Sequence, residues 1–169
     1  MTADISAVGS EGILFCFFVE SCISGVKDWI YRERVMGLQY TTKVDGDTMI
    51  VVTSGIDATL ADVQNYAMEV LLECLKIGIR RVFCDETALG YQLGTFDTYE
   101  LGKFFSSNVP AVMKVAIVHN PDFSSDARFY ENVVVNRGGK LRMFTDAAAA
   151  RRWLLGPEFS SDSGSLTEV

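Results

Sequence analysis

The sequence is poor in the residues that build metal and redox centres. Its 169 residues include one histidine and four cysteines, and no two cysteines form a C-x-x-C pair. Zinc-binding spacing is therefore absent, and we expect neither a metal nor a cofactor. The motifs G-x-G-x-x-G, G-x-x-x-x-G-K-[ST] and G-x-S-x-G are also missing. Their absence excludes the commonest dinucleotide-binding, phosphate-binding and hydrolase sites.

Positive charge is in the minority, with 15 Lys and Arg against 22 Asp and Glu and a net charge of −7. Nucleic acids and anionic membranes require clustered positive charge, so we exclude a nucleic-acid partner. The apolar run at 13–19 is too short to span a bilayer. No Lys or Arg precedes that run as a secretory leader would require. We therefore expect no membrane span and a cytoplasmic location.

What the sequence does contain is a repeated alternation of β-type apolar runs and capped helices. Its apolar content of 49% is typical of a folded protein, and its length suits one domain. The alternation predicts an α/β fold with the order ββαβαβαβα, in which a mixed, mostly parallel sheet has an antiparallel first strand. We expect strands at 38–44, 48–53, 79–84, 112–118 and 140–144, and helices at 59–78, 97–107, 124–137 and 145–155.

Local signals fix several ends of these elements. Gly46 lies between the first two strands and favours a hairpin. Thr59, Asp97 and Thr145 are expected to cap helices, and Gly78 is expected to end the first helix. Cys74 shares a helical face with apolar residues, so we interpret it as a core residue in a reducing environment.

The two ends of the chain do not follow this alternation. Residues 1–35 form an N-terminal extension, either an extra helix with an apolar stripe or an over-extended reading frame whose natural start is Met36. We favour the second interpretation, because Arg32-Glu33-Arg34 can be encoded by the purine run that precedes bacterial start codons. The domain is expected at 36–156, and the serine-rich segment 157–169 is expected to be disordered.

Any site should lie where the carboxyl ends of the parallel strands meet. His119 ends one strand and is suited to acid–base chemistry, although a lone histidine in a turn is more often structural. The segment 85–96 has no clear periodicity, and we interpret it as a loop that covers the core or binds a partner or an apolar ligand. The candidate site residues are Ser54, Asp85, Glu86, Thr87, Tyr91, His119 and Thr145.

Several segments of the sequence resemble those of the STAS-like family, which includes sporulation anti-sigma-factor antagonists and the cytoplasmic domains of sulphate transporters. They are 48–54, Arg81-Val82-Phe83-Cys84-Asp85, 114–118, Asn136-Arg137-Gly138, 142–146 and Trp153-Leu154. The resemblance covers 38–155 and implies a non-catalytic switch or ligand-binding module. The antagonists carry an Asp-Ser-Ser/Thr-Gly signature at their phosphorylation site. Here the corresponding residues are Asp85-Glu86-Thr87, so switching by phosphorylation is not expected.

We therefore expect a cytoplasmic regulatory or ligand-binding module, with an unknown protein or a small apolar or anionic ligand as partner. Two alternatives stay open. One is a small enzyme that uses His119 with Asp85 or Glu86. The other is an assembly protein, for example a homodimer, that associates through the loop at 85–96.

Overall fold

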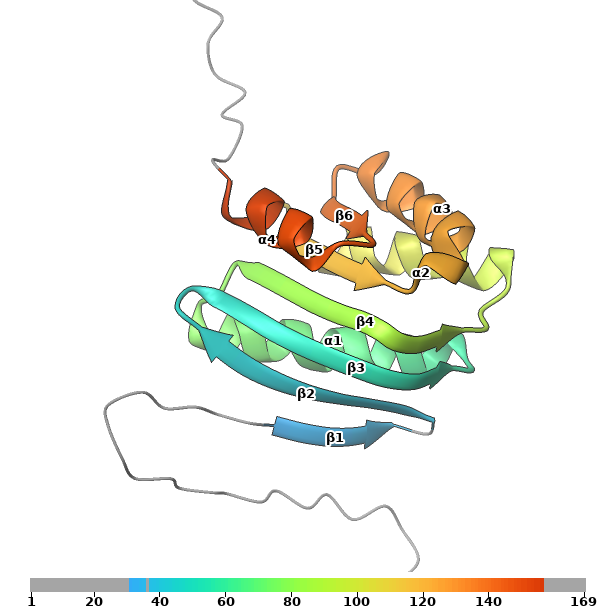
Figure 1. Cartoon of the computed structure of the whole chain (residues 1–169), viewed down its shortest axis with the longest axis horizontal. Coiled ribbons are helices and arrows are strands. Elements are labelled where there is room, and N and C mark those ends of the chain that lie inside the picture. The colour runs from blue at the N-terminus through green and yellow to red at the C-terminus, as the bar shows by residue number, and fades with distance from the viewer. Residues whose placement is uncertain (1–30, 36, 157–169) are drawn as a thin grey trace, which may run out of the picture.

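The computed structural model describes residues 31–35 and 37–156, which form a six-stranded sheet in the spatial order β1-β2-β3-β4-β5-β6 (Figure 1). The β1–β2 and β2–β3 pairs are antiparallel, and β3 to β6 pair in parallel. The strands are β1 (Tyr31–Val35), β2 (Leu38–Asp45), β3 (Thr48–Asp57), β4 (Arg81–Tyr91), β5 (Lys114–His119) and β6 (Lys140–Phe144). The helices are α1 (Leu60–Ile77), α2 (Thr95–Asn108), the short η1 (Pro121–Phe123), α3 (Ser124–Val135) and α4 (Ala147–Leu155).

The predicted fold class, a mixed and mostly parallel sheet with an antiparallel N-terminal strand, is confirmed, and the sheet has one strand more than expected. The additional strand β1 pairs antiparallel with β2 and precedes Met36, so the sheet includes residues that we assigned to the extension. The expected apolar stripe ending at Ile30, the start at Met36 and the tail at 157–169 lie outside the described residues.

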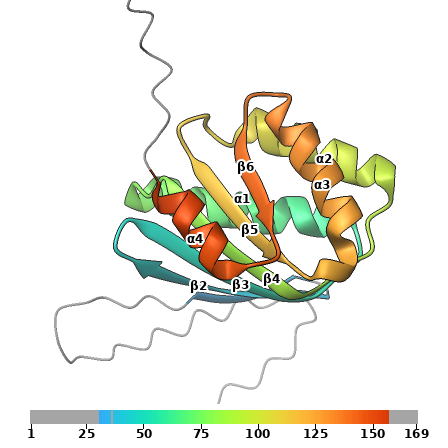
Figure 2. The same cartoon turned by 45° about the horizontal axis from the view of Figure 1, so that its top comes forward.

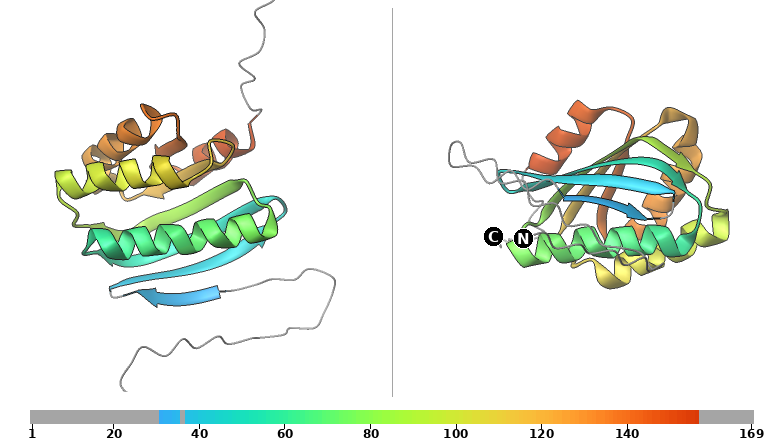
Figure 3. Two further views of the ribbon diagram at one scale, coloured as in Figure 1. Left: turned by 180° about the vertical axis from the view of Figure 1, so that it is seen from behind. Right: turned by 90° about the horizontal axis from the view of Figure 1, so that it is seen from below.

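The sheet separates two apolar cores of unequal size. The larger core joins the sheet to α1, α2 and α3, with Tyr66, Phe105 and Val134 contributed by these three helices. The smaller core joins the opposite face to α4, which buries Ala150 and Leu154 against Phe83 on β4. Figures 2 and 3 show α4 on one side of the sheet and α1 with α2 on the other. The described helices include none long and apolar enough to cross a bilayer.

The segment 85–96 is not the loop that we predicted. Strand β4 continues through Tyr91, and β3 continues past Ser54 to Asp57, so the two strands pair in parallel over four more positions. The strand predicted at 48–53 continues further because Gly55, with φ of 100°, lets the chain run beside Gly37. The carbonyl oxygen of Gly37 then accepts a hydrogen bond of 3.1 Å from the amide of Ile56.

Some of the observed helix ends agree with those predicted from the sequence. The Thr59 side chain accepts a hydrogen bond from the amide of Asp62, and Gly78 ends α1 with φ of 77°, as predicted. Two predicted caps are wrong: α2 begins two residues before Asp97, with Gly94 at the N-cap position, and Asp146 rather than Thr145 caps α4. At the start of α4, Thr145 and Asp146 are adjacent and both are good capping residues, so residue type alone does not distinguish them.

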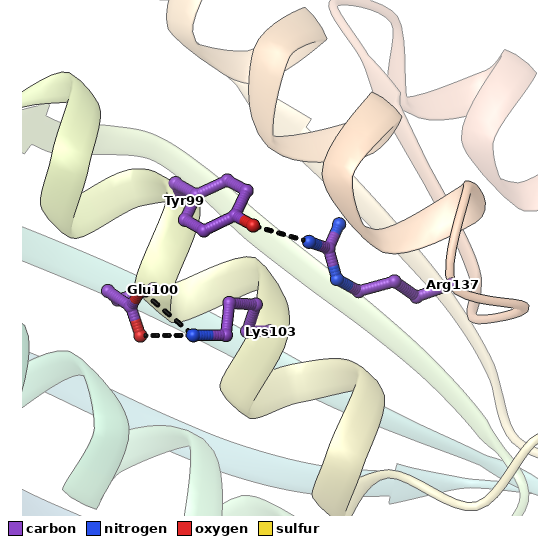
Figure 4. Close-up of polar contacts among 4 residues, drawn as sticks. All are labelled: Tyr99, Glu100, Lys103 and Arg137. Carbon is purple, nitrogen blue, oxygen red and sulfur yellow. Dashed lines mark hydrogen bonds and ion pairs between the residues drawn. The ribbon is translucent and has the colours of Figure 1, made fainter.

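Helices α2 and α3 pack closely along one face of the sheet. Gly102 lies directly against Val133, and a side chain at position 102 would overlap it. At the end of α3, the Arg137 guanidinium donates a hydrogen bond of 2.9 Å to the hydroxyl of Tyr99 and lies over its ring (Figure 4). Lys103 pairs with Glu100 one turn along the same helix. This packing holds α2 and α3 together over the face of the sheet that carries the larger core.

Candidate functional site

A β-bulge in β4 creates the candidate site. Val52 pairs with Asp85 and Ser54 pairs with Ala88, so β4 carries one extra residue between these two pairs. Successive side chains of a regular strand alternate between faces, and residues five positions apart would lie on opposite faces. The extra residue at the bulge shifts this alternation by one position, so Tyr91 returns to the same face as Glu86. As a result, Glu86 and Tyr91 both lie on the face that α1, α2 and α3 cover.

Glu86 and Tyr91 form a hydrogen-bonded pair inside the larger core. The Tyr91 hydroxyl donates to Oε2 of Glu86 over 2.6 Å, and the glutamate is only 8% exposed. Burial raises the pKa of Glu86 to about 7, although the bond from Tyr91 opposes the shift. The same burial, with the Glu86 charge, raises the pKa of the Tyr91 phenol, so it stays a protonated donor. At neutral pH the Glu86 carboxyl is therefore poised between its acid and its anion.

This pair lines a cavity of about 120 Å³ between the sheet and the three helices. Most of its walls are aliphatic or aromatic, and they come from β2 to β6 and from α1, α2 and α3. The apolar lining residues are Leu38, Val63, Ala67, Val70, Leu71, Val82, Leu89, Leu93, Leu101, Phe105, Val109, Met113, Val115, Ile117 and Met143. Polar groups enter this lining at few points.

Two further carboxyl groups line the cavity. Asp57, at the end of β3, is buried and accepts a hydrogen bond from the amide of Gln92. Burial raises its pKa, backbone hydrogen bonds oppose this, and the charge of Asp126 adds to the rise. Asp126 lies on the first turn of α3 and is exposed. The carboxyl groups of Asp57 and Asp126 thus join Glu86 in one acidic lining.

Two tyrosines from the helices complete the polar lining. The Tyr66 hydroxyl on α1 shares a hydrogen bond of 3.0 Å with Thr53 on β3. Tyr130 on α3 packs edge-on against Phe105 of α2. Burial raises the pKa of both phenols, and the charge of Glu86 adds to the rise in each case. Both therefore stay neutral, and their rings and hydroxyls face the same space as Glu86.

The structure does not bring all seven candidate residues into this cavity. Asp85 and Thr87 form their own exposed pair, in which the Thr87 hydroxyl donates to Asp85 over 2.7 Å. Asp85 alternates with Glu86 along β4 and lies toward the opposite face. Ser54 is half-buried on β3, and Thr145 is exposed after β6. Of the described residues that line the cavity, only Glu86 and Tyr91 were among our candidates.

His119 lies near the site without lining it. It is the register partner of Glu86 across β4 and β5, and its side chain is buried. Its Nδ1 lies 2.8 Å from the carbonyl oxygen of Asn120. The Asn120 side chain in turn accepts from the amide of Asp122 and caps η1. His119 is thus held at the end of β5 by the turn that follows it.

Sequence reasoning missed Asp57, Tyr66, Asp126 and Tyr130. Asp57 ends a parallel strand, which was the criterion we applied, but the predicted strand stopped at Thr53. Tyr66 lies on the apolar stripe of α1, where its hydroxyl was the only sign of a polar role. Cys84, which also lines the cavity, is buried, and burial followed by the Glu86 charge raises its thiol pKa. Across 31–35 and 37–156, no three His, Cys, Asp or Glu side chains group as metal ligands.

The fold and site together define a mixed α/β domain with a hydrogen-bonded glutamate–tyrosine pair inside a largely apolar cavity. No family model matches the chain, and no curated protein matches it. Among solved structures, the chain is similar to an uncharacterised protein of the DUF3478 family with a SpoIIAA-like fold from Shewanella loihica PV-4. The identity is 20%, the TM-score is 0.41, and the match covers 72% of this chain and 97% of that chain. No function follows from that uncharacterised protein.

Proposed function

We propose that this chain is a non-catalytic binding module that holds a small, largely apolar molecule in the cavity between the sheet and α1, α2 and α3. Glu86 and Tyr91 would supply the polar contact that orients the ligand, and the aliphatic walls would supply most of the affinity. The other candidate residues, Ser54, Asp85, Thr87, His119 and Thr145, are not part of this proposal.

The observation that carries the proposal is the coexistence of an unfilled apolar volume and a buried carboxyl group. Protein interiors are packed to high density, and each of these features lowers the free energy of unfolding. An engineered apolar cavity of about 150 Å³ in another protein binds benzene. A cavity of about 120 Å³ is therefore of the size for a ring or a short branched chain.

A regulatory role, which the STAS-like resemblance implies, fits this arrangement. Leu93, just before α2, and Thr98 and Leu101 in its first two turns line the cavity, and Phe96 in the first turn is 73% exposed. A ligand that pushed against the first turn of α2 would change the surface around Phe96. That surface is our candidate for the protein partner.

The acid–base alternative has one observation in its favour, the register pairing of Glu86 with His119. Against it, His119 is absent from the described residues lining the cavity, and its Nδ1 lies within hydrogen-bond distance of the Asn120 carbonyl. The assembly alternative required a loop at 85–96. Tyr91 instead ends β4 and packs against Phe123, with ring centroids 5.2 Å apart.

The proposal is tested by enlarging a side chain of α1 so that it fills the cavity. Ala67 lines the cavity, whereas Ala61 lies on the exposed side of the same helix. Ala67→Leu should abolish the binding of benzene and benzyl alcohol, followed as saturable shifts of amide NMR signals. Ala61→Leu adds the same side chain outside the cavity and should bind both probes like the unmodified chain. Failure of both probes to bind the unmodified chain would overturn the proposal.

A further inference from the structure

We propose that the cavity selects a small apolar amine in its protonated form, with the ammonium group beside Glu86 and the carbon skeleton against the aliphatic walls. This inference rests on the proposed function, and it adds the chemical class of the ligand. Three features of the cavity favour such a ligand: the charges that line it, the aromatic rings beside them and the size of the space.

The charged groups of the lining are all acidic. Glu86, Asp57 and Asp126 contribute carboxyl groups, and the described lining residues include no Lys, Arg or His. An anionic ligand such as a carboxylate would meet repulsion from these groups and no opposite charge. A cation would meet attraction from each of them, and the attraction is strongest where water is excluded. Of the small apolar or anionic ligands expected from the sequence, the anionic class is thus disfavoured.

The carboxyl groups also disfavour one another's charge. The charge of Asp57 raises the pKa of Glu86, and the charge of Asp126 raises the pKa of Asp57. A bound ammonium group would offset this repulsion as well as the cost of burying the glutamate anion. A neutral ligand offers no such compensation. Tyr91 occupies Oε2, and a carboxylate accepts about four hydrogen bonds, so Glu86 has acceptor capacity for an ammonium donor.

Aromatic rings form a second feature suited to a cation. Tyr66, Tyr91 and Tyr130 all line the cavity, and each comes from a different element. The face of an aromatic ring attracts a cation, and the attraction grows when both are desolvated. The combination of one carboxylate and several rings is a chemically reasonable environment for an ammonium group. The ligand's apolar part is limited to about six carbon atoms by comparison with the benzene-sized cavity.

The test compares three probes of matched shape: benzylamine, benzyl alcohol and benzoate. At pH 8 we expect benzylamine to bind the unmodified chain at least tenfold more tightly than benzyl alcohol, and benzoate to bind more weakly than both. Glu86→Gln should reduce the preference for the amine over the alcohol to less than threefold. Dissociation constants are measured from amide NMR shifts, at two ionic strengths.

A matched control separates the cavity from general attraction to an acidic protein. Asp122 is exposed near α3, and it is not among the described residues that line the cavity. Asp122→Asn should keep the full preference for benzylamine. If Asp122→Asn and Glu86→Gln reduce the preference equally, the amine is attracted by net charge and the inference is wrong.

The pH dependence gives an independent readout. Titratable groups face Glu86 from five elements: Asp57 on β3, Cys84 and Tyr91 on β4, His119 on β5, Tyr66 on α1, and Asp126 with Tyr130 on α3. Affinity for benzylamine should rise severalfold between pH 5.5 and pH 8 as Glu86 ionises, and affinity for benzyl alcohol should not rise. Any part of the pH dependence of benzylamine affinity that is lost in Glu86→Gln is caused by ionisation of Glu86 rather than of these neighbours.

The outcomes separate the two proposals. Equal affinity for the amine and the alcohol, unchanged by Glu86→Gln, overturns the amine inference and leaves the binding module intact. Binding of the alcohol that survives Ala67→Leu, or no binding of any probe, overturns the proposed function itself.

Discussion

At the scale of single residues, the chemistry of this protein centres on Glu86. Two effects act on its carboxyl group in opposite directions: burial favours the neutral acid, and the hydrogen bond from Tyr91 favours the anion. Burial is the larger effect, and the pKa rises from 4.5 to about 7. A buried group with such a pKa changes its charge near neutrality, as functional groups in clefts commonly do.

This shift makes the stability of the fold depend on pH. Because the folded state holds the Glu86 proton up to pH 7 and the unfolded state releases it near 4.5, the contribution is present at low pH and is lost as pH rises to 7. The shift corresponds to about 3 kcal/mol. We expect Glu86→Gln to gain stability relative to the unmodified chain by an amount of that order between pH 4.5 and pH 8. Urea denaturation at a series of pH values measures the difference.

The control for this prediction is Asp85→Asn, which removes a neighbouring carboxyl group from the opposite face of β4. It should leave most of the pH dependence in place. A parallel pH dependence for Glu86→Gln and the unmodified chain would show that Glu86 titrates alike in the folded and unfolded states.

At the scale of elements, the site depends on the extension of β3 and β4 past their expected ends. Gly55 permits this extension in two ways: its φ of 100° suits glycine, and its missing side chain leaves room for the carbonyl oxygen of Gly37. The bulge in β4 then turns Leu89 and Tyr91 back toward the helices. The two features act together, because the bulge lies within the β3–β4 pairing that Gly55 extends.

We expect Gly55→Ala to be strongly destabilising. The left-handed backbone costs about 1–2 kcal/mol for alanine, and the overlap with Gly37 adds to that cost. Gly46 is the matched control, because it has φ of 61° and an added methyl group would have open space. Gly46→Ala should therefore lower the free energy of unfolding only by the cost of placing alanine in a left-handed backbone conformation. The free energies of unfolding of both variants measure the difference, and equal values would mean that Gly37 moves aside freely.

At the scale of the whole molecule, one sheet carries two cores, and both described cysteines belong to the larger one. Cys74 has no exposed surface, and burial raises its thiol pKa to about 12. Cys84 is also buried, and burial raises its pKa as well. The thiolate is the reactive form of cysteine, so both side chains are protected by burial and by protonation.

Alkylation at pH 8 should therefore leave Cys74 and Cys84 unmodified in the folded protein and modify both in urea. Peptide mapping by mass spectrometry assigns the modified positions. We expect the two residues to react at similar rates, because both become accessible when the larger core opens. Faster reaction of Cys84, which lines the cavity, would show that the cavity opens without unfolding of the core.

Much of the fold was predictable because its signals are local. The hairpin at Gly46, the cap at Thr59 and the end of α1 at Gly78 depend on residues within a few positions of each other. The segment 85–96 was not predictable in this way. Its strand forms by pairing with residues 54–57, and its polar and glycine residues are not typical of a strand in isolation. Glu86 and Tyr91 were identified as candidates, but their contact was not.

The sequence by itself determined the α/β class, the number and order of strands and α-helices from β2 onward, and the absence of the common nucleotide-binding motifs. Periodicity and capping are properties of short stretches of chain, so they can be assigned without coordinates. Only the tertiary structure decided that one extra residue in β4 turns Tyr91 toward Glu86, and that Asp57, Tyr66 and Tyr130 share their cavity. Strand register and helix packing arise from contacts between distant residues, and these contacts built the site.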